Sequence, residues 1–118
     1  MKILIVDDEP IVRRSLWRAA EKRGHQTAEA KDGWEAIEVW QKFAPDLVFL
    51  DVLMPGLSGP DVIQRMDGRT HAKILLMSAY SGEYNIDQIP NRGVDRFLKK
   101  PFNDILEIIT AAEELVGR

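Results

Sequence analysis

Short runs of apolar residues recur along the chain, and in most stretches between them apolar residues fall at every third or fourth position. One run of four, Leu-Val-Phe-Leu at 47–50, follows a Pro-Asp pair and ends in Asp51. Such a run is typical of a strand that is covered on both faces. Similar runs, weakest at 25–30, predict five strands, at residues 2–6, 25–30, 46–51, 73–78 and 94–99.

Helical spacing fills most of the intervals between these strands. Pro10 suits a first helical turn, and Gly24 stands where a left-handed cap would end that helix. Asp32 can cap the second helix and Asn103 the last one. We predict helices at residues 10–23, 33–43, 60–66 and 104–116. Any helix between residues 81 and 93 would be short or irregular, because glycine, asparagine and proline interrupt the pattern.

The last predicted helix is apolar on two sides. One stripe comprises Ile105, Ile108, Ala112 and Leu115, and the adjacent stripe comprises Leu106, Ile109 and Val116. The second stripe could bind a partner or a second copy of the chain in a homodimer, or the core could absorb both stripes. Trp34 and Trp40, on the second predicted helix, are expected to pack rather than to bind a ligand.

Strands that alternate with helices predict an α/β fold in which a doubly wound parallel sheet has helices on both faces. The 118 residues fit one domain, 1–118, and no repeat or linker divides them. In such sheets, ligands bind beyond the carboxyl ends of the strands, where the strand order reverses. The residues that end the predicted strands are therefore the first candidates for function.

Composition excludes several kinds of site and partner. The net charge is -3 and the basic residues are scattered, which argues against direct nucleic-acid binding and against a membrane-binding patch. The chain has no cysteine, so disulfides and thiolate metal sites are excluded. The apolar N-terminus is interrupted at Asp7, too early for a signal peptide or a membrane span. We expect a cytoplasmic protein.

Five polar residues end the predicted strands, namely Asp7, Asp8, Asp51, Ser78 and Lys100. Asp51 alone is as consistent with a solvated strand end as with chemistry. Three carboxylates, a hydroxyl and an ammonium group at one edge are harder to explain by stability, because the like charges repel. Such oxygen donors suit Mg²⁺, which is usually held by one or two carboxylates and by phosphate oxygens.

The same residues predict phosphoryl transfer. Asp51 would be the nucleophile that attacks phosphorus and forms an acyl phosphate. Lys100 would neutralise one phosphoryl oxygen, and the hydroxyl of Ser78 would donate to another. Little else is required, because positioning and electrostatics supply most of the catalysis in this reaction.

Four motifs resemble the receiver domain of two-component response regulators. They are Val-Asp-Asp-Glu-Pro at 6–10, Leu-Asp-Val-Leu-Met-Pro at 50–55 with Gly59 after it, Met-Ser-Ala at 77–79 and Phe-Leu-Lys-Lys-Pro-Phe at 97–102. Each motif alone is weak, but their order and spacing are specific and cover nearly the whole chain. The resemblance implies a flavodoxin-like (βα)5 receiver over 1–118, with strand order 2-1-3-4-5.

The resemblance also implies roles for the matched acidic residues. Asp51 would be the phosphoacceptor, supplied by a histidine kinase or by a phosphotransfer protein. Asp8 and Asp51 would ligate Mg²⁺, or Mn²⁺ in its place, and Asp7 would act mainly through water. The backbone carbonyl of Leu53 would be a further ligand.

Other matched positions imply a conformational switch. Ser78 and Phe97 match the two switch positions of receivers, where the hydroxyl moves toward the phosphoryl group and the ring fills the vacated space. Partners would then read the face formed by the last two strand-helix units. The bond between Lys100 and Pro101 matches the place where receivers carry a cis peptide.

Two positions depart from the family's usual chemistry. Leu53 and Tyr80 match the positions that tune dephosphorylation, and neither has a carboxylate or amide to orient water. We expect slow loss of the phosphoryl group. Receivers also place a regular helix where residues 81–93 carry the interrupted pattern.

Three hypotheses follow. The first is a signalling switch that is not an enzyme beyond its own phosphorylation and dephosphorylation. The second is a phosphotransferase or phosphatase that uses Asp51 on a small substrate, although Leu53 stands where a second aspartate would serve as general acid. The third is an interaction module that is never phosphorylated, against which the complete set of charged residues argues.

Overall fold

A parallel sheet forms the centre of the molecule in the computed structural model, which describes residues 1–79 and 93–117. Its five strands are β1 (Lys2–Val6), β2 (Gln26–Ala30), β3 (Leu47–Asp51), β4 (Lys73–Ala79) and β5 (Arg96–Lys100). Their order is β2-β1-β3-β4-β5, and every neighbouring pair is parallel. The predicted α/β class and strand order are confirmed.

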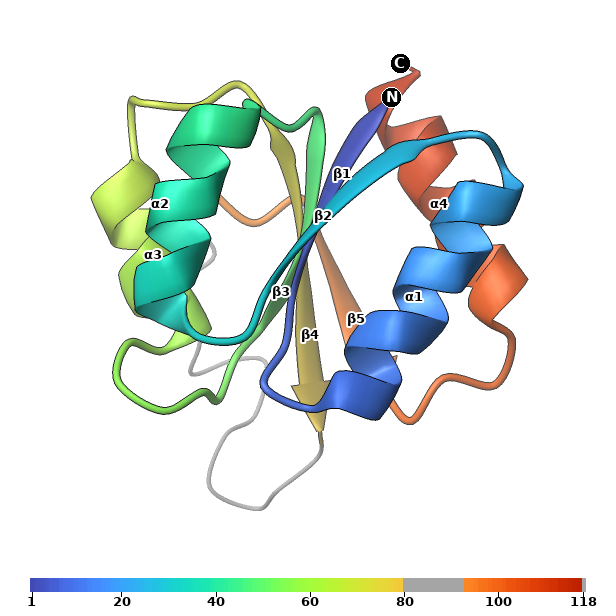
Figure 1. Cartoon of the computed structure of the whole chain (residues 1–118), viewed down its shortest axis with the longest axis horizontal. Coiled ribbons are helices and arrows are strands. Elements are labelled where there is room, and N and C mark those ends of the chain that lie inside the picture. Colours follow the sequence, from blue (N-terminus) through green and yellow to red (C-terminus); the bar gives the residue numbers. More distant parts are fainter. Residues whose placement is uncertain (80–92, 118) are drawn as a thin grey trace.

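Helices cover both faces of the sheet (Figure 1). They are α1 (Pro10–Lys22), α2 (Gly33–Phe43), α3 (Gly59–Met66) and α4 (Ile105–Val116). Helices α2 and α3 pack on one face, and α1 and α4 pack on the other. None of the helices in the described ranges is long and apolar enough to cross a membrane.

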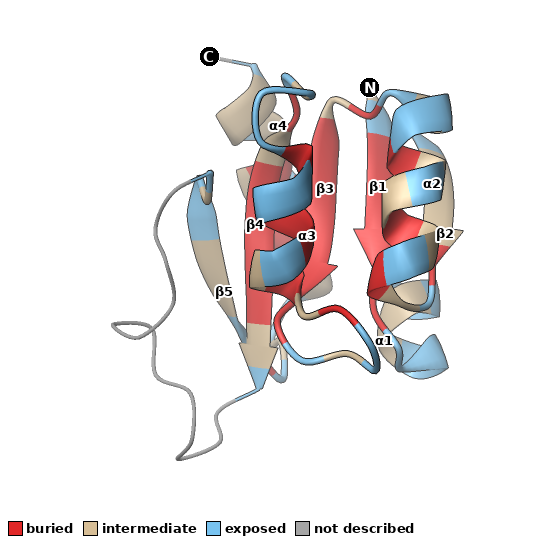
Figure 2. Cartoon of the chain, turned by 90° about the vertical axis from the view of Figure 1, so that its left-hand side faces the viewer, coloured by how far each residue is buried: buried red, intermediate tan, exposed pale blue. Residues whose placement is uncertain are grey.

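The core consists of two clusters separated by the sheet. Because successive strand residues point to opposite faces, neighbouring residues of one strand belong to different clusters. Leu50 packs toward α2 and α3, whereas Phe49 packs toward α1 and α4. Every residue of β3 is buried (Figure 2), as the continuous apolar run predicted. The central strands therefore give a rigid base to the residues at their ends.

Side-chain caps explain where three of the helices begin. The carboxylate of Asp32 accepts from the amide of Glu35 at 2.8 Å, as predicted for α2. Ser58 caps α3 and forms a reciprocal capping box with Asp61. Asp104, rather than the predicted Asn103, caps α4 through the amides of Leu106 and Glu107. The prediction placed this cap one residue too early, because both side chains can serve.

The structure corrects the predicted bounds of two strands and the helix face assigned to Ile109. Strand β5 begins later than predicted and includes Lys100, which had been placed after it, and β4 continues one residue past Ser78. Ile109 is fully buried, so it does not belong to an outward stripe with the half-exposed Leu106. Trp40 is buried as expected, whereas Trp34 is 57% exposed and its ring packs against the guanidinium of Arg65, 4.9 Å from the ring centroid. The irregular helix expected within residues 81–93 lies almost wholly outside the described residues.

Candidate functional site

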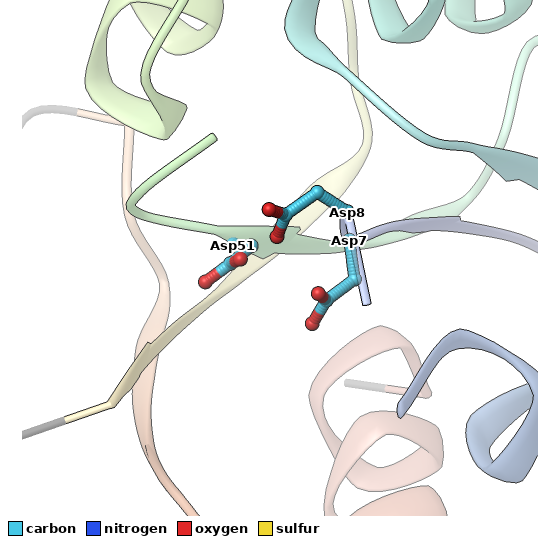
Figure 3. Close-up of side chains that lie close together, drawn as sticks. All are labelled: Asp7, Asp8 and Asp51. Carbon is cyan, nitrogen blue, oxygen red and sulfur yellow. The ribbon is translucent and has the colours of Figure 1, made fainter. Parts of the chain in front are cut away.

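The topology brings the ends of β1 and β3 side by side. Val6 pairs with Leu50, so the residues that follow each of them lie at the same edge, where the strand order reverses. Carboxylate oxygens of Asp7, Asp8 and Asp51 all lie within 4.8 Å of one another (Figure 3). Asp7 and Asp51 are buried, whereas Asp8 is exposed to solvent. The predicted acidic cluster therefore exists as a local site.

Lys100 supplies the positive charge of this cluster. Its Nζ lies 2.6 Å from Oδ2 of Asp7, 3.3 Å from Oδ1 of Asp51 and 3.5 Å from Oε1 of Glu9. The side chain comes from the end of β5 and is 8% exposed. The Lys100–Pro101 peptide bond is cis, at the position that the family resemblance implied. The ammonium group thus contacts two buried carboxylates that would otherwise repel each other.

Backbone contacts hold Asp7 from several directions. Its amide donates to the carbonyl of Ala30 at 3.2 Å, and its Oδ1 accepts from the amide of Glu9 at 2.9 Å. The guanidinium of Arg13 donates to its carbonyl at 2.8 Å. Asp7 is therefore fixed by the edge strand β2, by the turn before α1 and by α1 itself.

Burial and charge shift the pKa values of the buried groups. Burial, reinforced by the negative charge of Asp7, raises the pKa of Asp51 to about 7, against the opposing effect of Lys100. Burial also raises the pKa of Asp7, although Lys100 and the Glu9 amide favour its charged form. For Lys100, burial alone would lower the pKa, but the contacts with Asp7 and Asp51 outweigh it and raise the pKa.

The loop after Asp51 is held close to the site by a glycine. A Cβ atom at Gly59 would lie 2.4 Å from the backbone oxygen of Asp51, so only glycine fits without movement. The Gly59 amide donates to the carbonyl of Val52 at 2.8 Å, and the Val52 amide donates to the carbonyl of Met77 at 2.9 Å. Leu53, in the same loop, is 45% exposed. The start of α3 thus fixes the backbone that follows Asp51.

The two predicted switch residues lie on adjacent strands. Phe97 pairs with Leu76 in the β4–β5 register and packs, partly buried, against the cluster beneath α2 and α3. Ser78 lies two residues after Leu76, so it belongs to the same face of the sheet. Its hydroxyl donates to the carbonyl of Ala79 at 3.2 Å. Tyr80, predicted to tune dephosphorylation, lies outside the described residues.

The donor set fits a hard divalent cation. Three carboxylates offer oxygen ligands within 4.8 Å of one another, and no sulfur or imidazole group is among them. Lys100 sets one ammonium group against these three carboxylates, so the four groups formally carry more negative than positive charge. Mg²⁺ prefers such oxygen ligands and retains waters, which the exposed Asp8 side of the site permits.

A groove of about 670 Å³ borders the site. It runs between the first turns of α1 and the segment after β5, and its walls include Glu9, Ile11, Val12, Ser15, Lys100 and Phe102. Ile11 is 82% exposed, the most exposed large apolar residue in the described ranges. The groove therefore presents an exposed apolar side chain beside the acidic cluster.

Sequence patterns did not single out Arg13 or Glu29, and they included Glu9 only as part of a motif. Glu9 and Arg13 contact Asp7 or Lys100, and Glu29 contacts Arg13. Arg13 lies one helical turn beyond Glu9, so its side chain can reach back to the loop. That spacing was a usable signal, but charged residues on a helix are more often solvated.

Comparisons with known proteins agree with the geometry. A family model described as "Response regulator receiver domain" matches residues 3–113. Sporulation initiation phosphotransferase F of Bacillus subtilis is 36% identical over 96% of this chain and 91% of its own length. Transcriptional regulatory protein PdtaR of Mycobacterium tuberculosis is 33% identical over 99% of this chain. The chain spans only 57% of PdtaR, a little over half of that relative.

The fold also matches that of a solved response regulator structure. Response regulator protein TrrA from Thermotoga maritima, in complex with Mg²⁺-BeF, is 33% identical and superposes with a TM-score of 0.84. The match covers 97% of each chain. Both the sequence and the fold are therefore similar to proteins of one family.

Proposed function

Because the chain belongs to the response regulator receiver domain family, we propose that it is a phosphorylation-dependent signalling switch with Asp51 as its acceptor. The observation that carries this proposal is the position of Asp51. It is a buried carboxylate at the end of a central strand, beside two more carboxylates and 3.3 Å from an ammonium group. If Asp51 were simply a solvated residue at a strand end, it would be exposed to water and would have no ammonium group beside it.

The residues of the chain supply most of what the reaction needs. An oxygen of Asp51 forms a bond to phosphorus while the bond from phosphorus to an imidazole nitrogen of the phosphohistidine donor breaks, and the imidazole leaves with the electron pair. Lys100 donates to a phosphoryl oxygen, and the hydroxyl of Ser78 donates to another. A bound Mg²⁺, or Mn²⁺, held by Asp8, Asp51 and the Leu53 carbonyl, with Asp7 acting through water, would neutralise phosphoryl charge.

The partners in this proposal bind at different surfaces. A histidine kinase or phosphotransfer protein would approach the groove beside Ile11, which borders the acceptor site. A downstream partner, or a second copy of the chain, would bind the face formed by the last two strand-helix units after Ser78 and Phe97 rearrange. Phe97 is only partly buried and packs against the core cluster beneath α2 and α3. Neither Leu53 nor Tyr80 has a carboxylate or amide to orient water, so hydrolysis would be slow.

The test is formation of a covalent adduct. With acetyl phosphate and Mg²⁺, we expect intact-protein mass spectrometry to detect one added phosphoryl group per chain, on Asp51 after peptide mapping. Asp51→Asn should abolish the adduct, because an amide oxygen is a poor nucleophile. Beryllofluoride with Mg²⁺ should change the chemical shifts of Ser78 and Phe97.

Asp104→Asn is the matched control. Asp104 is an exposed aspartate that caps α4, and asparagine caps helices equally well. This variant should form the adduct at the wild-type rate. Repeated hydrolysis of acetyl phosphate without a lasting adduct would instead identify a phosphatase or phosphotransferase. No reaction at all would leave only an interaction module and would contradict the proposal.

A further inference from the structure

We infer that Arg13 is a positioning residue for the acidic pair and that Glu29, on the edge strand β2, holds it in place. This inference rests on the proposed function, since it names a residue that prepares the same site for its cation. Arg13 contacts neither the acceptor nor a phosphoryl group. It acts on the peptide unit that joins Asp7 to Asp8.

The guanidinium of Arg13 binds two parts of the chain with different nitrogens. Nη1 donates to the carbonyl of Asp7 at 2.8 Å, and Nε lies 3.4 Å from Oε1 of Glu29. The side chain of Arg13 is 16% exposed, so water competes little for these contacts. The planar guanidinium fixes the directions of both contacts, which an ammonium group would not do.

The position of Arg13 in α1 explains how it reaches the loop. Helical side chains lean toward the N-terminus of their helix, and Arg13 lies in the first turns of α1. Its own amide donates to the carbonyl of Glu9 at 3.1 Å, which fixes the turn between Asp7 and the helix. Backbone and side chain of one residue thus hold both ends of the loop.

Glu29 is placed to hold Arg13 rather than to serve as an ordinary surface charge. Its Oε1 is buried and has no hydrogen-bond partner in the described part of the chain, but it faces the guanidinium of Arg13. A buried carboxylate oxygen is costly unless a cation lies beside it. The burial of this oxygen therefore favours one orientation of the Arg13 side chain.

The contact between Arg13 and the Asp7 carbonyl mainly affects the orientation of Asp8. The side chain of Asp7 is already held by the Glu9 amide and by Lys100. Asp8 is exposed, so packing restrains it little and the backbone sets the direction of its carboxylate. By fixing the carbonyl of Asp7, Arg13 fixes the peptide plane from which Asp8 departs. Residues that orient ligands in this way typically change metal affinity by about 10- to 100-fold.

The experiment compares Arg13→Lys and Arg13→Gln with Arg14→Lys and Arg14→Gln. Arg14 is the matched control, because its Nε lies 3.9 Å from the same Glu29 oxygen but its side chain is 63% exposed. Titration calorimetry should show Mg²⁺ binding about tenfold weaker for both Arg13 variants and unchanged for both Arg14 variants. In metal-free protein, exchange of the Glu9 amide hydrogen should be faster by about tenfold only in the Arg13 variants.

Glu29→Gln should reproduce part of both effects, and its combination with Arg13→Gln should be less than additive. Wild-type Mg²⁺ affinity in Arg13→Lys would overturn the inference, because charge alone would then suffice. An equal loss of Mg²⁺ affinity in the Arg13 and Arg14 variants would also overturn the inference. The amide exchange needs neither cation nor phosphoryl donor, so it decides the role of Arg13 even if Asp51 accepts no phosphoryl group.

Discussion

Asp51 and Asp7 carry the highest electrostatic cost of any residues at the site. Both are buried, and both have a raised pKa because burial disfavours their charged forms. Lys100 offsets the cost only in part, since one ammonium group serves two buried carboxylates. Burying the carboxylate of Asp51 therefore costs the fold free energy that an apolar residue at the same strand end would not cost, and such costly titratable groups are more frequent at functional sites.

The raised pKa of Asp51 predicts how the stability of the metal-free protein depends on pH. The folded pKa of Asp51, about 7, lies above the unfolded value, so the folded state binds its proton more tightly. Its contribution to the free energy of unfolding is full below about pH 4 and is lost as the pH rises to about 7. Asp51→Asn removes this dependence. Urea denaturation should measure the free energy of unfolding of both proteins. The value for Asp51→Asn minus the value for the wild type should increase by about 2 kcal/mol between about pH 5 and 8.

Asp46→Asn serves as the control for that measurement. Asp46 lies at the opposite end of β3, where its side chain accepts from the amide of Lys2. An asparagine there should leave the pH dependence as in the wild type. A constant difference between Asp51→Asn and wild type across the pH range would contradict the raised pKa.

At the scale of the elements, the start of α3 lies directly against the backbone of Asp51 at the end of β3. Helix α3 begins against the backbone oxygen of Asp51, and Gly59 permits this approach. Ser58 and Asp61 close a capping box there, so the helix start is fixed independently of the site. Movement of α3 would therefore move the backbone at Asp51.

Gly59→Ala tests this coupling. The added methyl group would lie 2.4 Å from the Asp51 oxygen, so strand or helix must shift. We expect the free energy of unfolding to fall by about 2 kcal/mol and adduct formation at Asp51 to slow. Urea denaturation and the acetyl phosphate reaction measure the two effects.

Gly68→Ala separates the steric cause from a general loss of stability. Gly68 has a φ of +76° and nothing lies where its Cβ would be, so alanine costs about 1 kcal/mol through backbone strain alone. It should destabilise the fold and leave the rate at Asp51 unchanged. An equal slowing in both variants would show that lost stability, rather than contact with Asp51, affects the reaction.

For the whole molecule, the order of the strands places the acidic cluster. The chain forms β2 on one side of β1 and β3 on the other, so the ends of β1 and β3 meet where the order reverses. Strand β5, at the sheet's far edge, supplies Lys100. The site thus depends on three strands, and only the folded chain assembles it.

Cation binding should therefore stabilise the whole fold. Mg²⁺ at a hundredfold excess over its Kd should raise the free energy of unfolding by about 2.7 kcal/mol, and chelation should reverse the gain. Asp8→Asn should remove most of this gain, whereas Asp104→Asn should retain it. Thermal denaturation with and without Mg²⁺ measures the effect, and an equal gain in both variants would place the cation elsewhere.

The sequence by itself determined the class of fold and the edge at which its polar residues meet. Hydrophobic periodicity is a local property, so the strands and helices could be predicted within a few residues. The parallel arrangement then places Asp7, Asp8, Asp51 and Lys100 at one edge of the sheet. Errors arose where local signals were ambiguous, as for Asn103 and Asp104, which can both cap a helix.

The tertiary structure alone decided which of these groups are buried and what contacts them. Burial depends on helices that are distant in sequence, so Asp51 and Asp7 are buried while their neighbour Asp8 is exposed. The contact between Arg13 and the Asp7 carbonyl depends on how α1 packs beside β1, as the burial of Ile109 depends on α4 packing against the sheet. Charge and hydrophobicity can be read from each residue, but distance and solvent exposure are properties of the folded chain.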